Sequence, residues 1–297
     1  MAHRLPTKLS LFIIVFLLGV GFGLLWWQFR KLYSTQVQQR GSIMSENILD
    51  HPEVLSILFH PRRGVDFTSN GVSVPIEVEP GLSLSAYLHE AGDSAPLILF
   101  FHGNGEIAAD YATIGPMYAQ LGISFLIIDY RGYGMSGGQP TTSNQLTDAV
   151  AVFEQLDDIL AANNVKPAKI YVMGRSLGSA SAIEVAHKNG DQLGGIIIES
   201  GFANTFSLIS RLGGLDIDAD DATMGYGNTA KIEEITIPTL IIHGMEDYLI
   251  PASDGQTLHD RSAAADKRIV LVPRAGHNDL MLVGMAPYFN AVNDFVK

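Results

Sequence analysis

Residues 172–181 read "VMGRSLGSAS" and place Ser176 between Gly174 and Gly178. The apolar run before this stretch predicts a β-strand, and the small residues after it predict a helix that lies close to the sheet. In a sharp strand-to-helix turn the serine is held in a strained conformation, and residues two positions away must lack a side chain to avoid a collision. The context therefore indicates a nucleophilic serine, with a helix-capping serine in an ordinary tight turn as the alternative.

Short β-rich runs alternate with helical patterns from about residue 60 onward. Strands are expected over 97–101, 123–129, 169–174, 195–199, 238–244 and 268–273. Their continuous apolar character is typical of strands buried on both faces of a parallel sheet. A helical apolar stripe runs through 143–164, with Ser143 or Thr142 as the expected N-cap. The sequence predicts an α/β domain with a mostly parallel sheet and helices on both faces.

A serine hydroxyl is a weak nucleophile unless a base accepts its proton and a third group orients that base. "VPRAGHND" places His277 after the last expected strand, and "HGMEDYLIP" places Asp247 after the one before it. Active sites of such sheets lie at the carboxyl ends of the strands, and the chain order Ser, Asp, His is that of α/β-hydrolases. We predict Ser176 as nucleophile, His277 as base and Asp247 as acid. Glu199 remains an alternative acid, and Asp247, like Glu246, could instead be an ordinary acidic residue of a turn.

Hydrolysis through a tetrahedral intermediate also needs backbone N–H groups directed at the developing negative charge. The segment "FFHGNGE" follows the first expected central strand and can turn sharply at its glycines. Its position suggests the N–H groups of Asn104 and Leu177 as the oxyanion hole. An ordinary glycine turn is the alternative interpretation.

The N-terminal run 9–29 contains no charged residue and ends in "LLWWQF". As a helix it would span roughly 30 Å, about the thickness of a hydrocarbon core. We expect a short tail at 1–8, a transmembrane anchor at 9–29, a linker at 30–60 and a catalytic domain at 61–297. A cleaved signal peptide is the alternative, although its apolar region would be shorter. Basic residues flank the run on both sides, so the side of the membrane that the domain faces stays open.

Charge is distributed unevenly along the chain. The first 40 residues contain Lys and Arg but no Asp or Glu, so all 31 acidic residues lie in the rest. Such an acidic domain should be repelled by nucleic acid and by anionic lipid surfaces. The chain has no cysteine, which excludes disulfides, thiolate metal ligands and a cysteine nucleophile.

Neither a cofactor nor a metal is expected. "GYGMSG" at 132–137 fits a dinucleotide-binding pattern, but the residues that follow do not open a helix at once. "DIDADDATMGYG" at 216–227 imitates a calcium loop but lacks its glycine and its final glutamate. Both segments are interpreted as loops.

Together these segments resemble the membrane-anchored serine hydrolases of the α/β-hydrolase superfamily, the Bem/YfhR-like group, which is related to α/β-hydrolase-domain depalmitoylases. The resemblance covers about 65–297 and rests on six segments: "FFHGNGE", "IIDYRGYGMSGGQPT", "VMGRSLGSASA", "IIIESGF", "IPTLIIHGMEDYLIP" and "RAGHNDL". It implies the α/β-hydrolase fold and the same triad, Ser176, Asp247 and His277. The glycine after Asn104 departs from the family, which more often has alanine there.

The resemblance implies cleavage of an ester or thioester of a small-molecule or lipid-like acyl substrate, or of an acylated protein. It also extends to peptidases of the prolyl-oligopeptidase type, so amide cleavage remains an alternative, as does a non-catalytic scaffold. In this superfamily the lid is inserted in the interval that corresponds here to the residues between Glu199 and Pro238. That interval is short in this chain. A minimal lid and an open pocket are expected.

Overall fold

The computed structural model describes residues 47–64 and 71–297. Residues Leu49–Lys297 form one compact unit. The predicted anchor at 9–29 lies outside the described residues. Within the described residues, no helix is long and apolar enough to cross a membrane.

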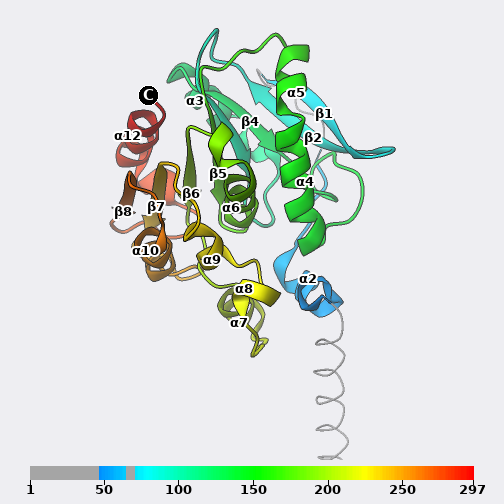
Figure 1. The fold of residues 1–297 in the computed structure, drawn as a ribbon, viewed down its shortest axis with the longest axis vertical. Helices are drawn as coiled ribbons and strands as arrows, with labels where there is room; N and C mark the ends of the chain where they lie inside the picture. The colour runs from blue at the N-terminus through cyan, green and yellow to red at the C-terminus, as the bar shows by residue number, and fades with distance from the viewer. Residues whose placement is uncertain (1–46, 65–70) are drawn as a thin grey trace, which may run out of the picture. The chain divides into compact units, whose positions relative to one another are not determined.

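The centre of this unit is an eight-stranded sheet with the strand order β1-β2-β4-β3-β5-β6-β7-β8 (Figure 1). The strands are β1 (Val72–Glu79), β2 (Leu82–His89), β3 (Leu97–Phe101), β4 (Ser124–Ile128), β5 (Ile170–Arg175), β6 (Gly195–Glu199), β7 (Thr239–Gly244) and β8 (Lys267–Val272). β1 pairs with β2, and β2 with β4, in antiparallel fashion, whereas the pairs from β4 to β8 are parallel. The predicted mostly parallel sheet is confirmed.

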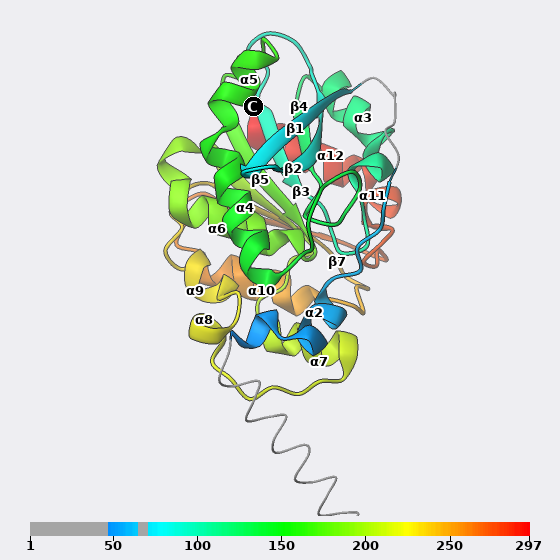
Figure 2. The same cartoon turned by 90° about the vertical axis from the view of Figure 1, so that its right-hand side faces the viewer.

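Helices cover both faces of the sheet (Figure 2). Their bounds are α2 (Pro52–Leu58), α3 (Ile114–Gln120), α4 (Thr142–Glu154), α5 (Leu156–Ala162), α6 (Gly178–Asn189), α7 (Thr205–Gly213), α8 (Asp221–Met224), α9 (Asn228–Ile232), α10 (Ala252–Arg261), α11 (Leu280–Val283) and α12 (Met285–Val296). α4, α6 and α10 lie on one face, and α3 and α12 lie on the other. The helices on both faces explain why the central strands are apolar on both sides.

The core under α3 and α12 is rich in aromatic side chains. Tyr118 of α3 stacks on Phe125 of β4 with ring centroids 4.3 Å apart, and Phe289 of α12 packs edge-on against Tyr118. On the opposite face, α6 lies close to β5 because its first turns contain only small buried side chains. These two packed layers hold the carboxyl ends of the parallel strands in fixed positions.

The structure differs from the sequence analysis at the start of the compact unit and in the helix predicted over 143–164. The compact unit begins at Leu49 rather than at 61, because η1 (Ile48–Asp50) and α2 fold within the predicted linker 30–60. Val54 and Leu58 of α2 are fully buried, and α2 packs on α7. The N-cap of α4 is Thr141, which accepts a hydrogen bond from the backbone N–H of Asn144, rather than Ser143 or Thr142. The predicted helix 143–164 divides at Gln155 into α4 and α5.

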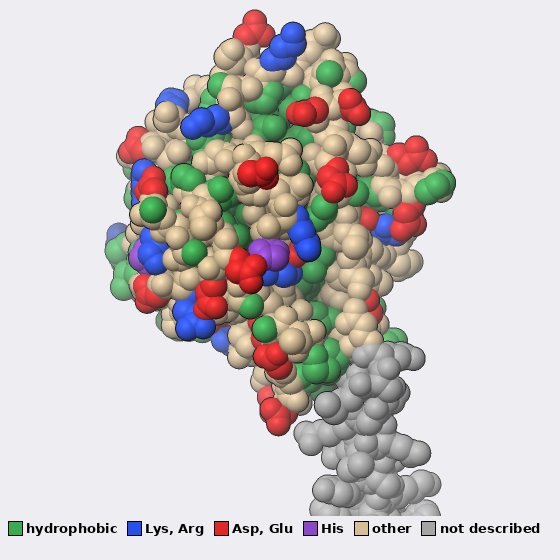
Figure 3. All heavy atoms as spheres, in the orientation of Figure 1, with side chains coloured by type: hydrophobic (Ala, Val, Ile, Leu, Met, Phe, Trp, Pro, Cys, Tyr) green, Lys and Arg blue, Asp and Glu red, His purple; other side chains and the backbone are tan. Residues whose placement is uncertain are grey.

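The surface agrees with the acidic composition. Figure 3 shows acidic side chains spread over one face of the domain, with basic side chains between them rather than gathered in one continuous patch. Such a face offers no extended basic surface for a nucleic-acid backbone.

Candidate active site

Ser176 lies in the sharp turn between β5 and α6. Its φ angle is 54°, a left-handed conformation that is uncommon for a residue with a side chain. A Cβ added to Gly174 would lie 2.2 Å from the carbonyl oxygen of Gly178, and one added to Gly178 would lie 2.2 Å from that of Phe101. Only glycine fits at these two positions, which is the physical reason for the pattern around the serine. A strained serine held this way is typical of a nucleophilic site.

His277 connects Ser176 to Asp247. Its Nε2 lies 2.9 Å from Ser176 Oγ, and its Nδ1 lies 2.7 Å from Asp247 Oδ2. An ionised carboxylate only accepts hydrogen bonds, so the proton of the neutral ring is assigned to Nδ1, and Nε2 is left to accept from the serine hydroxyl. All three side chains are buried, whereas Glu246 is exposed. The loops after β5, β7 and β8 thus bring the three predicted residues into one hydrogen-bonded chain.

The carboxylate of Asp247 is surrounded by donors. The backbone N–H groups of Leu249 and Ile250 donate to its Oδ1 at 3.0 and 2.8 Å. Burial acts to raise the pKa of Asp247, but hydrogen bonding with His243 and His277 outweighs this effect, and the pKa lies well below its usual range. Asp247 therefore stays ionised at neutral pH and orients His277.

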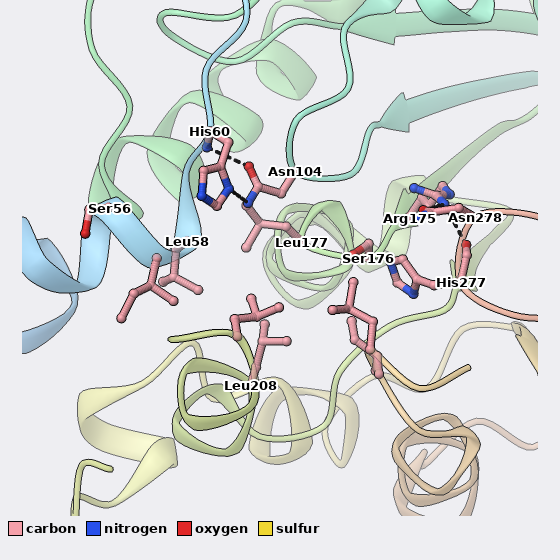
Figure 4. Close-up of a pocket in the computed structure, with 14 residues that line it drawn as sticks. Ser56, Leu58, His60, Asn104, Arg175, Ser176, Leu177, Leu208, His277 and Asn278 are labelled. Atoms are coloured by element: carbon pink, nitrogen blue, oxygen red, sulfur yellow. Dashed lines mark hydrogen bonds between the residues drawn. The ribbon is translucent and has the colours of Figure 1, made fainter. Parts of the chain in front are cut away.

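Asn104 and Leu177, the predicted oxyanion pair, line the same cavity as Ser176 (Figure 4). Within the described part of the chain, neither backbone N–H donates a hydrogen bond. The side chain of Asn104 is held in place, because its Oδ1 accepts from the His60 N–H and from the Tyr133 hydroxyl, both at 2.8 Å. Asn104 and Leu177 thus both border the cavity beside Ser176, and no hydrogen bond with another described residue uses their N–H groups.

A cavity of about 380 Å³ lies in front of Ser176. Its polar end contains Ser176, His277 and Asn104, and its other walls come mainly from α2, α7 and the loop after β7. These walls contribute six apolar side chains: Ile57, Leu58, Leu208, Leu212, Leu249 and Ile250. α7 belongs to the predicted short insertion, whereas the contribution of α2 was not anticipated.

Three residues near the site escaped the sequence analysis. His243, at the end of β7, places its Nε2 2.8 Å from the carbonyl oxygen of Ile250 and 3.5 Å from Asp247 Oδ2. His60 contacts Asn104, and Arg175 lies buried beside Ser176. The only signal for Arg175 was a lone charge in an otherwise apolar and small stretch, which requires a buried partner that the local sequence does not supply.

Glu199, the alternative acid, lies at the end of β6 and is almost fully buried. It pairs with Arg175 and accepts from the hydroxyl of Tyr288 at 2.7 Å, whereas His277 Nδ1 is occupied by Asp247. Burial raises the pKa of Glu199 above its usual value, although Arg175 and Tyr288 act against this effect. Glu199 thus pairs with the charge of Arg175 and does not contact His277 Nδ1.

Among the described residues, no group of three or more His, Asp or Glu side chains could hold a metal ion. The acidic segment 216–227 forms a loop that contains α8, and the segment 132–137 is a loop after β4.

The chain is similar in sequence to proteins of a known family. The family model described as serine aminopeptidase, S33 (Hydrolase_4) matches residues 92–209. An uncharacterised protein of Mycobacterium tuberculosis is 30% identical over 237 residues, which cover 76% of this chain and 79% of that protein. Protein bem46 of Schizosaccharomyces pombe is 28% identical over 78% of each chain. The chain belongs to the Hydrolase_4 family of α/β-hydrolases.

Solved structures give the same fold. An esterase of Pyrococcus furiosus is similar with a TM-score of 0.65 and 20% identity, over 80% of this chain and 97% of that one. At that level of identity the similarity supports the α/β-hydrolase fold.

Proposed function

We propose that this protein is a membrane-tethered serine hydrolase that cleaves a carboxylic ester or thioester through an acyl-enzyme intermediate. The observation that carries the proposal is the hydrogen-bonded chain from Ser176 through His277 to Asp247, with Ser176 in a strained turn at the floor of a cavity. The family and the structural similarity to an esterase support hydrolysis as the reaction class.

In the first step, His277 Nε2 accepts the hydroxyl proton of Ser176 as Oγ attacks the acyl carbonyl carbon. The carbonyl oxygen becomes an oxyanion and accepts hydrogen bonds from the N–H groups of Asn104 and Leu177. Asp247, held ionised, stabilises the positively charged His277 and keeps its ring in place.

His277 then donates the proton to the departing alcohol or thiol, and the acyl group stays on Ser176. A water molecule next gives its proton to His277 and attacks the acyl carbon. Collapse of the second tetrahedral intermediate releases the carboxylic acid and returns the proton to Ser176.

The cavity lining supports a neutral acyl group as the substrate part bound there. Seven of the residues that line the cavity are apolar, and none of its described lining residues is an aspartate or glutamate. An aminopeptidase substrate carries an ammonium group that a carboxylate would have to meet. The lining thus favours an ester or thioester over a peptide with a free amino terminus.

Tethering to a membrane rests on the apolar run 9–29 and its flanking basic residues. The acidic domain itself would be repelled by anionic lipids, so the anchor would hold the enzyme near acyl substrates presented by the membrane. A reporter fused after Lys297 tests on which side of the membrane the domain lies.

The direct test of the function is Ser176→Ala. We expect it to abolish hydrolysis of short p-nitrophenyl esters and covalent labelling by a fluorophosphonate probe, because the attacking oxygen is removed. Ser253→Ala, which changes an exposed serine of α10, is the matched control and should leave both unchanged. Labelling that persists in Ser176→Ala would refute the proposal. Faster cleavage of peptide amides than of acyl esters would assign the protein to the peptidases.

A further inference from the structure

Arg175 precedes Ser176 directly, and its guanidinium group lies where three loops meet. The loops are the serine turn (174–178), the oxyanion loop (102–106), which contains Asn104, and the histidine loop (273–279), which contains His277. Arg175 is only 8% exposed. Since arginine is almost never buried without partners, the donors of its guanidinium group need acceptors from the surrounding structure.

The link to the histidine loop is direct. Nη2 of Arg175 donates to the backbone carbonyl oxygen of His277 at 2.7 Å and to Asn278 Oδ1 at 3.1 Å. Figure 4 shows Arg175 beside Asn278 and His277, with Ser176 next to the imidazole. This contact holds the main chain of His277 while Asp247 holds its ring from the other side.

The link to the oxyanion loop runs through Glu106. Nη1 of Arg175 is paired with Glu106 Oε1, and Glu106 Oε2 accepts from the backbone N–H of Gly103 at 2.7 Å and from the Tyr111 hydroxyl at 2.8 Å. Gly103 directly precedes Asn104. A Cβ on Gly103 would lie 2.8 Å from Arg175 Nη1, so the loop approaches the guanidinium group as closely as its backbone allows.

The remaining donor of Arg175 is directed at the sheet. Nε pairs with Glu199 Oε1 at 3.1 Å, and the other oxygen of Glu199 accepts from Tyr288 of α12. The cation is thus fixed to β6 and, through Tyr288, to the helical layer behind the sheet. A rigid support of this kind can hold three loops in one arrangement.

From these contacts we infer that Arg175, with Glu106, is a positioning residue that sets the distance between Ser176, His277 and the N–H group of Asn104. The inference rests on the proposed function for its catalytic consequence. It assigns the residue between Gly174 and Ser176 a role separate from the proton-transfer chain, because Arg175 touches the backbone of His277 rather than the reacting atoms.

Two variants test the inference. Arg175→Lys keeps the charge, but a compact ammonium group lacks the planar fork through which Arg175 reaches Glu106, Glu199 and the carbonyl oxygen of His277 from separate nitrogens. Glu106→Gln keeps the shape, but Arg175 and the N–H of Gly103 donate to different oxygens of Glu106, and in glutamine an NH₂ group replaces one of these two acceptors. Misplacement by about 1 Å can cost about 100-fold in rate, so kcat for short acyl esters should fall by about 10- to 100-fold, with KM changed by about twofold or less.

The matched control is Arg131→Lys. Arg131 is buried to the same degree, at 9% exposure, and also pairs with two carboxylates, Asp148 of α4 and Glu79 of β1. We expect Arg131→Lys to lower the Tm by a similar amount to Arg175→Lys and to leave kcat unchanged. A folded Arg175→Lys protein with wild-type kcat, or an equal loss of kcat in Arg131→Lys, would overturn the inference.

A measurement on the resting protein, without substrate, tests the positioning role of Arg175 independently of the proposed function. The downfield proton resonance of His277 Nδ1–H reports the hydrogen bond to Asp247 in the resting protein. It should shift or broaden in Arg175→Lys and Glu106→Gln but stay in place in Arg131→Lys. An unchanged resonance in Arg175→Lys would contradict the inference, whereas a wild-type protein that is inactive and unlabelled would contradict only the proposed function.

Discussion

At the scale of single residues, the charge of Asp247 is the clearest example of a side chain whose state depends on the fold. The carboxylate is buried, yet two backbone N–H groups and two histidines surround it. Its folded pKa lies below the ordinary value of about 3.9, so its charge stabilises the fold at pH values above that value. This stabilisation is lost as the pH falls through the range below it.

Asp247→Asn should therefore destabilise the protein most at neutral pH. The difference in the free energy of unfolding between wild type and variant should narrow below about pH 4, because the carboxyl group of the unfolded wild-type chain then binds a proton that the folded protein still excludes. Chemical denaturation of both proteins at a series of pH values measures this difference in the free energy of unfolding. Asp266→Asn, which changes an exposed carboxylate paired with Arg268, should stay within about 0.5 kcal/mol of wild type. If the difference in unfolding free energy between wild type and Asp247→Asn did not change with pH, the lowered pKa of Asp247 would be contradicted.

At the scale of secondary-structure elements, α2 has a larger role than its length suggests. It precedes the sheet in the chain, packs on α7 and supplies the apolar wall opposite Ser176. The segment that follows it holds the side chain of Asn104 through His60. A helix that the sequence analysis assigned to a linker thus contributes both to the cavity and to the support of the oxyanion loop.

Leu58→Ala tests whether α2 is an integral part of the fold. Leu58 is fully buried, so the variant should lower the free energy of unfolding by about 2–5 kcal/mol through lost burial and a residual cavity. Leu282→Ala removes the same atoms at a site that is 77% exposed and should change it by less than about 0.5 kcal/mol. Equal and small effects in denaturant titrations would mean that α2 adds little to the stability of the domain.

At the scale of the whole molecule, the described compact unit contains every residue of the proposed active site. Removing residues 1–46 should thus leave kcat and KM for water-soluble esters close to those of the full chain. The shortened protein should no longer sediment with membranes, because its acidic domain has little attraction for anionic lipids. Fractionation and an ester assay on both proteins measure the two effects. Continued sedimentation of the shortened chain would contradict anchoring by 9–29.

Strands β3 to β8 could be predicted because each contains a continuous apolar run, and their bounds differ from the expected ones by one residue or less. β3 to β7 are buried as expected, whereas the edge strand β8 is mostly half-buried or exposed. β1 and β2 were missed for an equally physical reason. β1 is an edge strand with alternating exposed and buried residues and a proline, and β2 contains Ser83, which is exposed, and Ser85, which is bonded to Asp129. β1 alternates along its whole length and β2 along its first half, so neither offers the continuous apolar run by which the other six strands were predicted.

By itself the sequence determined the parallel sheet, the turn around Ser176 and the chain order of Asp247 and His277, because these depend on local apolar runs and on glycines that no other residue can replace. Only the tertiary structure decided that Asp247 rather than Glu246 meets His277, that α2 forms a wall of the cavity, and that Arg175 joins three loops. These contacts link residues far apart in the chain. Asp247 and Arg175 are buried charges, and a buried charge is unfavourable unless partners brought by the fold surround it.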